Sequence, residues 1–178
     1  RVGSSTVSGP GGRERFSLSR ETESYDWKLG GGGKPDLQKA QDALNPLQGM
    51  SLSDVVPDPD SAAAGLDRPI VIRARTLDGV TYTLQVGNKT ADDRYFVSIA
   101  VNGEPATARK AGKSETAEEK EKQDKAFAED RARLLQKLER EKKLERWTYL
   151  VARATVEPLL RDRAQLLPDK KPKDGKKR

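Results

Sequence analysis

The sequence predicts an α+β fold, with a mostly antiparallel sheet covered on one face by helices. Alternating apolar and polar residues at 70–75 and 80–86 flank Asp78-Gly79, which is typical of a β-hairpin. Apolar residues recur at helical spacing within 35–44 and again within 155–167. Acid-before-base pairs four residues apart run through 115–146, and they indicate a long, solvent-exposed helix.

The amino-terminal segment, residues 1–14, is rich in Gly and Ser and has one Pro, which is typical of a flexible linker. Phe16 and Leu18 then alternate with polar residues, as do Tyr25, Trp27 and Leu29. This period of two predicts two antiparallel strands.

Four glycines and a lysine, residues 30–34, resemble part of a phosphate-binding loop. That motif needs Gly at the position of Lys28 and a hydroxyl residue at the position of Pro35. The magnesium ligand is therefore missing. The stretch is interpreted as a connector into a helix with Pro in its first turn.

Leu37, Ala40, Leu44 and Leu47 recur at helical spacing and predict a helix at 35–44, whose regular part Asn45-Pro46 ends. A brief extended segment is expected at 54–56. A very short helix is expected at 61–64, with Gly65 in the terminating position.

The alternation continues after the hairpin. Tyr95, Val97, Ile99 and Val101 predict a strand that ends at Asn102-Gly103, and the segment from Trp147 predicts the last strand. A closing helix follows at 155–167, with Pro158 tolerated in its first turn. The expected core residues are Trp27, Ile70, Ile72, Tyr82, Leu84, Val97, Ile99, Tyr149, Leu159 and Leu160.

These elements predict a domain organisation in four parts. Residues 1–14 are the flexible linker, 15–110 and 147–168 form one α+β domain, 111–146 are a charged helical insertion, and 169–178 are a disordered basic tail. The insertion has ten acidic and ten basic residues within 115–146, so it carries no net charge. Nucleic acid is not expected as a partner, because its binding requires an excess of Lys and Arg on one face.

The insertion has a thin apolar stripe that includes Phe127, Leu134, Leu135 and Leu138. Arg131 and Glu141 interrupt any coiled-coil seam. Two interpretations stay open: the helix docks lightly on its own domain, or the stripe binds a partner or a second copy.

The chain has no His and no Cys, which excludes Cys nucleophiles, Ser-His-Asp triads and His or Cys metal sites. Asp54, Asp58 and Asp60 lie close in sequence but lack the EF-hand pattern, and turn chemistry explains them more simply. We expect a non-catalytic protein with no cofactor and no metal.

The net charge is +6, and the tail 169–178 contributes six basic and two acidic residues, which gives +4. A polyanion or an anionic membrane could bind this tail, helped by Arg73, Arg75 and Arg94 on the predicted strands.

Several segments resemble a bacterial domain-of-unknown-function family commonly encoded beside ABC-type transporter and gliding-motility auxiliary subunits. The similar segments are Trp27-Lys28-Leu29, Asp54-Val55-Val56, Gly65-Leu66-Asp67-Arg68-Pro69, Val71-Ile72-Arg73, Asp78-Gly79, Tyr82-Thr83-Leu84-Gln85-Val86-Gly87, Trp147-Thr148-Tyr149-Leu150-Val151 and the positions Val156, Leu159, Leu160, Arg161, Arg163, Leu166 and Leu167.

The resemblance implies an extracytoplasmic, periplasmic accessory domain, anchored in the membrane by a segment before Arg1, with ABC transporter subunits as protein partners. It implies no catalytic residues. The start at Arg rather than Met fits the expectation that the chain is a fragment or a processed product.

Overall fold

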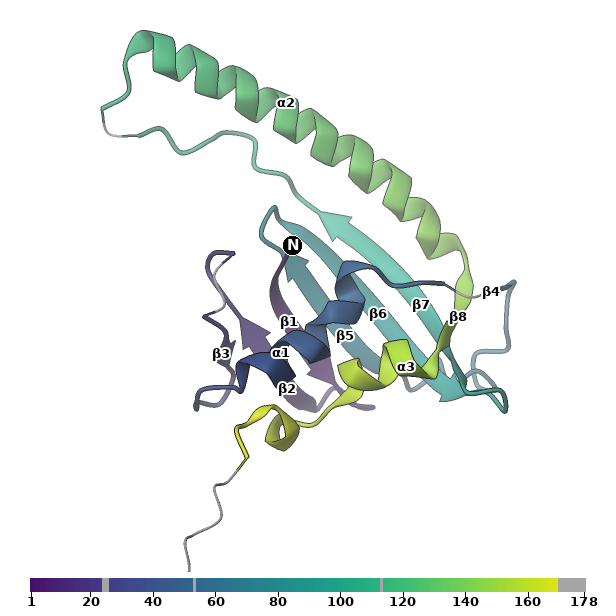
Figure 1. The fold of residues 1–178 in the computed structure, drawn as a ribbon. Coiled ribbons are helices and arrows are strands. Elements are labelled where there is room, and N and C mark those ends of the chain that lie inside the picture. Colours follow the sequence, from purple (N-terminus) through teal and green to yellow (C-terminus); the bar gives the residue numbers. More distant parts are fainter. Residues whose placement is uncertain (24–25, 53, 113, 170–178) are drawn as a thin grey trace, which may run out of the picture.

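The computed structural model describes residues 1–23, 26–52, 54–112 and 114–169, and it has one eight-stranded antiparallel sheet (Figure 1). The strand order is β3-β2-β1-β5-β6-β7-β8-β4. The strands are β1 Val2–Ser8, β2 Glu14–Ser19, β3 Lys28–Leu29, β4 Asp54–Val56, β5 Ile70–Thr76, β6 Val80–Lys89, β7 Arg94–Gly103 and β8 Thr148–Ala152. The α-helices are α1 Leu37–Leu44, α2 Ala117–Lys142 and α3 Arg153–Val156, and the 3₁₀ turns are η1 Asn45–Gln48, η2 Lys143–Arg146, η3 Glu157–Leu160 and η4 Arg163–Leu166.

This architecture confirms the predicted α+β class. Figure 1 shows α1 and α3 on the same face of the sheet, while α2 extends from one corner well beyond it. The hairpin of β5 and β6 pairs Ile72 with Leu84, and β7 and β8 continue the sheet as predicted.

The prediction that residues 1–14 form a flexible linker is wrong. Strand β1 lies inside the sheet, where Val7 pairs with Phe16 of β2 on one side and with Ile72 of β5 on the other. Its inward residues Val2, Ser5 and Val7 are all buried. The Gly-rich residues that follow are the turn that returns the chain into β2. Gly and Ser content therefore indicated flexibility where the chain forms an interior strand.

Two helix predictions also fail. Residues 61–64 form a single turn, in which the Asp60 carboxylate accepts from the Ala63 N–H at 2.7 Å and Gly65, at φ +69°, ends the turn as expected. The closing helix 155–167 is split into α3, η3 and η4. Pro158 lacks an N–H for a continuous helix, and Arg161 takes an extended ψ of 154° before Asp162 caps the next turn.

The main core lies between the sheet and the helices on its covered face. Of the predicted core residues, Trp27, Ile72, Leu84, Val97, Tyr149 and Leu159 are buried, and Ile70, Tyr82, Ile99 and Leu160 are half-buried against them. Helix α1 contributes Ala40, Ala43 and Leu44, whereas Leu37 is 44% exposed and does not belong to the buried face. The strand predicted around Tyr25 is observed at Lys28–Leu29, and Tyr25 itself lies outside the described residues.

Strand β6 holds the turn at 60–65 by a close backbone contact. The Asn88 N–H donates to the Ala64 carbonyl at 2.7 Å, and the Asn88 side-chain amide donates to the Ala63 carbonyl at 3.1 Å. A Cβ added at Gly87 would lie 2.1 Å from the Ala64 carbonyl oxygen. Only glycine leaves room for the turn at this position.

We predict that Gly87→Ala lowers the free energy of unfolding by about 1 to 3 kcal/mol, because the added methyl group must displace the turn. Urea denaturation measures this effect. Gly49→Ala is the control, since an added Cβ there meets nothing within 4 Å. A Gly87→Ala chain as stable as the Gly49→Ala chain would contradict the prediction.

Candidate functional site

Helix α2 and the described part of the loop before it form a projecting element, residues 104–112 and 114–142, which we call the arm. Figure 1 shows the loop running out along α2 and the helix returning to the sheet. The predicted capping box starts α2: the Thr116 hydroxyl accepts from the Glu119 N–H at 3.2 Å, and the Glu119 carboxylate accepts from the Thr116 N–H at 2.9 Å. Acidic residues in the first turn and basic residues in the last turn stabilise the helix, because their charges interact favourably with its dipole.

Little of α2 is buried. Leu138 alone among its 26 residues is buried, while Phe127 and Leu134 are half-buried. All residues of 117–126 are exposed. The outer part of the helix is therefore not stabilised by packing on the sheet.

Arg109 braces the loop against the outer half of α2. Its two terminal nitrogens donate to the two carboxylate oxygens of Glu115, each at 2.6 Å, and its Nε donates to Asp124 at 2.5 Å. The Arg109 and Glu115 side chains are only 12% and 13% exposed. A second contact, from Arg131 Nε to the Ala106 carbonyl at 3.1 Å, lies nearer the sheet. Such bidentate Arg–carboxylate pairs are among the stronger hydrogen-bonded contacts in proteins.

The same contacts shift the titration of the carboxylate. The hydrogen bonds from Arg109, followed by the Gly112 N–H at 2.5 Å, lower the pKa of Glu115 to about 2. The brace is therefore fully charged at neutral pH.

The base of the arm is anchored to the sheet. Leu138 packs with Val80 and Val101 in a small second core cluster. The Glu145 carboxylate accepts from the Val101 N–H at 2.6 Å, and the Tyr82 hydroxyl donates to Glu141. Burial of the Tyr82 hydroxyl and, to a smaller extent, its hydrogen bond to the Glu141 carboxylate raise the pKa of Tyr82 above its ordinary value.

A shallow cavity of about 470 Å³, which we call the arm cavity, lies where α2 leaves the sheet. Its apolar residues are Pro105, Ala106, Phe127 and Leu134. Its charged residues have both signs, with Asp78 and Asp130 beside Arg131, Arg133 and Lys137. Such a site suits an apolar side chain of a ligand with polar groups around it.

The structure separates the four predicted stripe residues. Phe127 and Leu134 both line the arm cavity, and Leu135, which follows Leu134 in sequence, is 36% exposed. Leu138 is 6% exposed and packs in its own domain, so its side chain is not available to a partner. Sequence reasoning missed the Arg109 brace, because no periodic pattern relates a loop arginine to Glu115 in the same loop and to Asp124 in the helix.

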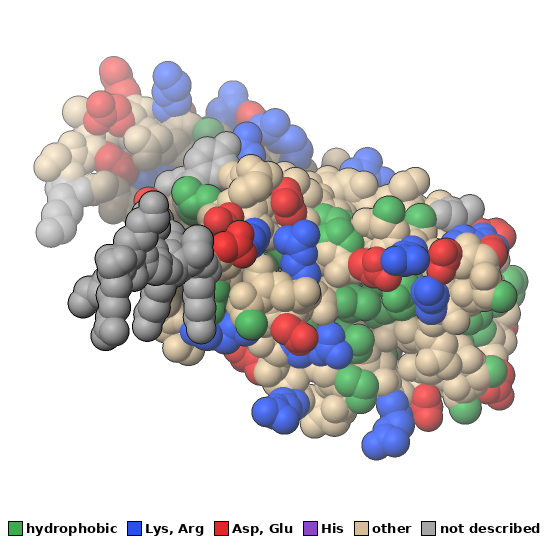
Figure 2. All heavy atoms as spheres, turned by 60° about the horizontal axis from the view of Figure 1, so that its bottom comes forward, with side chains coloured by type: hydrophobic (Ala, Val, Ile, Leu, Met, Phe, Trp, Pro, Cys, Tyr) green, Lys and Arg blue, Asp and Glu red, His purple; other side chains and the backbone are tan. Residues whose placement is uncertain are grey.

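The three predicted basic residues do not come together. Arg73 and Arg75 are exposed on the face of the sheet opposite the main core, whereas Arg94 pairs with Asp92 at 2.6 Å and lies 3.9 Å from Asp54. Figure 2 shows basic and acidic side chains intermixed on another face. Residues 170–178 of the basic tail lie outside the described part of the chain.

The Gly-rich loop presents carbonyl groups to a cation. Arg163 donates to the carbonyls of Gly30 at 3.0 Å and Gly31 at 3.2 Å, and also to that of Gly32. This arrangement favours the interpretation as a connector over that of a phosphate loop, in which N–H groups face the ligand. The described residues contain no group of three or more acids placed to hold a metal ion.

Within the part of the chain that the structure describes, no helix has both the length and the apolar character needed to cross a membrane. Comparison of the chain with protein-family models, curated proteins and solved structures gives no match. The resemblance to the bacterial family therefore stays a prediction.

Leu138 and Leu135 both lie on α2, but Leu138 is buried in the domain and Leu135 is exposed. We expect Leu138→Ala to lower the free energy of unfolding by about 2 to 3 kcal/mol, because it removes most of a buried side chain from a small cluster. Leu135→Ala should change it by less than about 0.5 kcal/mol, since this side chain is exposed. Denaturant titration gives both values, and equal losses for the two variants would show that the assignment of the two faces is wrong.

The brace makes a pH prediction. The folded pKa of Glu115 lies below its ordinary value of 4.5, so its contribution to stability is present above pH 4.5 and is lost as the pH falls toward about 2. Arg109→Gln should raise the pKa of Glu115 toward 4.5. Carboxyl ¹³C NMR titration measures the pKa of Glu115. The control is Arg131→Gln, which removes the hydrogen bond from Arg131 to the Ala106 carbonyl and should leave this pKa unchanged. Titration of Glu115 near 4.5 in the unaltered chain would refute the brace.

Proposed function

We propose that this chain is a non-catalytic interaction domain that binds a protein partner through the arm. The observation that carries the proposal is that the arm is held in a defined shape although most of α2 is not packed on the domain. Short-range contacts within the arm, above all the bidentate pair of Arg109 and Glu115, replace that packing. A projecting element that is already ordered loses less conformational entropy when a partner binds.

The arm cavity is the proposed centre of the interface. Phe127 and Leu134 provide apolar surface, and Leu135, which follows Leu134 in sequence, is an exposed apolar side chain on the same helix. Interfaces commonly combine such an apolar centre with a polar rim, here formed by carboxylates, guanidinium groups and Lys137. We therefore expect a partner that inserts an apolar side chain and presents both signs of charge around it.

The identity of the partner is proposed from the resemblance alone. The resemblance suggests that the partner is a subunit of an ABC-type transporter, which a membrane-anchored form of this protein would bind outside the cytoplasm. The lack of His and Cys narrows the available catalytic chemistry, and this supports a binding role. Turnover of a substrate that depended on a residue of the folded core would overturn the non-catalytic assignment.

Binding of a polyanion or an anionic membrane through 169–178 is the alternative. Arg73 and Arg75 on the open sheet face could add to it, since the described residues give them no ion-pair partner. Arg94 would add little, because Asp92 and Asp54 already surround it. This mode of binding would weaken steeply with salt and would not need the arm.

Site-specific photocrosslinking in native membranes tests the proposal. A photoreactive residue at Leu135 should crosslink to one defined protein, a transporter subunit if the resemblance holds, and Phe127→Ala should reduce the yield by at least about fivefold, as for a central interface residue. The matched control carries the photoreactive residue at Arg73, on the opposite face, and should give no such product.

Equal crosslinking from both positions, or a yield unaffected by Phe127→Ala, would rule out the arm as the interface. Recovery of nucleic acid or glycan, with no protein crosslinked at Leu135, would favour the polyanion alternative instead.

A further inference from the structure

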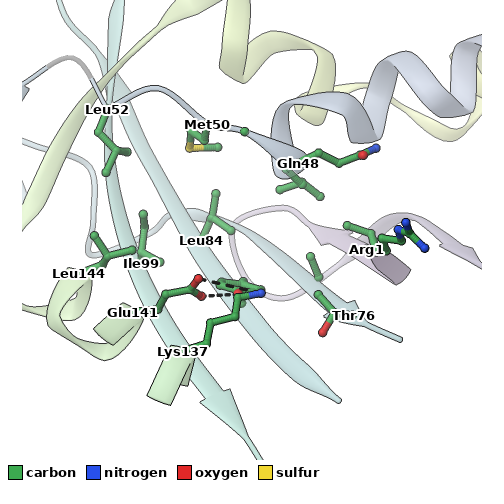
Figure 3. Close-up of a pocket in the computed structure, with 15 residues that line it drawn as sticks. Arg1, Gln48, Met50, Leu52, Thr76, Leu84, Ile99, Lys137, Glu141 and Leu144 are labelled. Carbon is green, nitrogen blue, oxygen red and sulfur yellow. Dashed lines mark hydrogen bonds and ion pairs between the residues drawn. The ribbon is translucent and has the colours of Figure 1, made fainter. Parts of the chain in front are cut away.

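A second cavity, separate from the arm cavity, lies on the covered face of the sheet and has a volume of about 410 Å³ (Figure 3). We call it the inner cavity. The sheet forms one wall, η1 with the segment after it forms another, and the base of α2 with η2 closes a third side. Figure 3 shows side chains from these three parts of the chain around a common space.

The walls of the inner cavity are mainly apolar. The residues that matter here are Leu47, Met50, Leu52, Leu84, Ile99 and Leu144. All except the buried Leu84 are only half-buried, although each packs against the main core. Their remaining apolar surface faces the cavity, which is of the size that small-molecule sites have. An apolar ligand would remove this surface from water.

Polar groups stand at the edge of the cavity beside α2. The Tyr82 hydroxyl donates to one carboxylate oxygen of Glu141, and Lys137 Nζ lies 4.0 Å from the other. Both oxygens of Glu141 therefore have a neighbouring donor. The Lys137 ammonium makes an ion pair with Glu141 but, among the described residues, no hydrogen bond, so its N–H groups can donate to a further anionic partner.

Arg1 is the other cationic residue among the described residues that line the inner cavity, but its guanidinium already donates to Glu23. Lys137 is thus the cation at this edge with the most unused hydrogen-bonding capacity. A carboxylate on a ligand would match Lys137 in charge, whereas a cationic head group would have to compete with Lys137 and Tyr82 for Glu141.

We infer that the inner cavity binds a single-chain amphiphile with a carboxylate head group. Its hydrocarbon chain lies among the six apolar residues, and its carboxylate accepts hydrogen bonds from Lys137. The inference does not depend on the proposed partner binding, because the cavity walls belong to the folded domain and to the base of α2, where the helix is anchored.

The only methionine of the chain provides a direct probe, because Met50 lines the inner cavity. The full chain, labelled with ¹³C at the Met50 methyl group, is titrated with dodecanoate below its micelle concentration. We expect a saturable shift of the Met50 resonance. Dodecyltrimethylammonium, with the same chain and a cationic head, should bind at least tenfold more weakly.

Lys137→Gln tests the head-group contact and should weaken dodecanoate binding about tenfold, as expected for the loss of a hydrogen bond to a charged group. Lys142→Gln is the matched control, since Lys142 is exposed on the same helix and does not line the cavity. It should bind dodecanoate like the unaltered chain.

Three results would overturn the inference: no saturable shift of Met50, equal affinity for the two amphiphiles, or equal affinity in the Lys137→Gln and Lys142→Gln chains. None of these results bears on photocrosslinking at Leu135, so the failure of one proposal is distinguishable from the failure of the other.

Discussion

Strand β7 is longer than the strand that pairs with its far edge, and this mismatch determines where the arm lies. Strand β8 pairs only with residues 94–98, so residues 99–103 have no strand beside them on that side. Backbone polar groups left buried without partners would cost free energy. The turn η2 and the base of α2 occupy the vacant place, and Glu145 accepts from the Val101 N–H.

Three contacts then fix the direction of α2. Leu138, Glu141 and Glu145 follow one another at spacings of three and four, so they share one face as the chain passes from α2 into η2. Gly103 permits the close approach, because a Cβ there would lie 3.0 Å from a methyl group of Leu138. With its base held in this way, the rest of α2 continues past the corner of the sheet, and the loop braced by Arg109 follows it.

Alternation predicted the strands β5 to β8 because their inward residues are large and apolar. Strand β1 escaped prediction because Ser5 stands at an inward position, where it is 1% exposed and its hydroxyl lacks a hydrogen-bond partner among the described residues. The register also shifts between Val2 and Ser4, which interrupts the period of two. In the closing segment, helical spacing of apolar residues was present, but Pro158 and the extended Arg161 broke the helix.

The sites were less predictable than the strands. The predicted stripe on α2 included Phe127 and Leu134, which line the arm cavity, but spacing alone could not show that Leu138 faces its own domain. The inner cavity had no sequence signal, because its residues come from segments far apart in the chain. Only the fold revealed that Lys137 borders both the inner cavity and the arm cavity. A ligand carboxylate in the inner cavity and an acidic group of a partner in the arm cavity would compete for Lys137. Ligand binding and partner binding would then each weaken the other to the same extent.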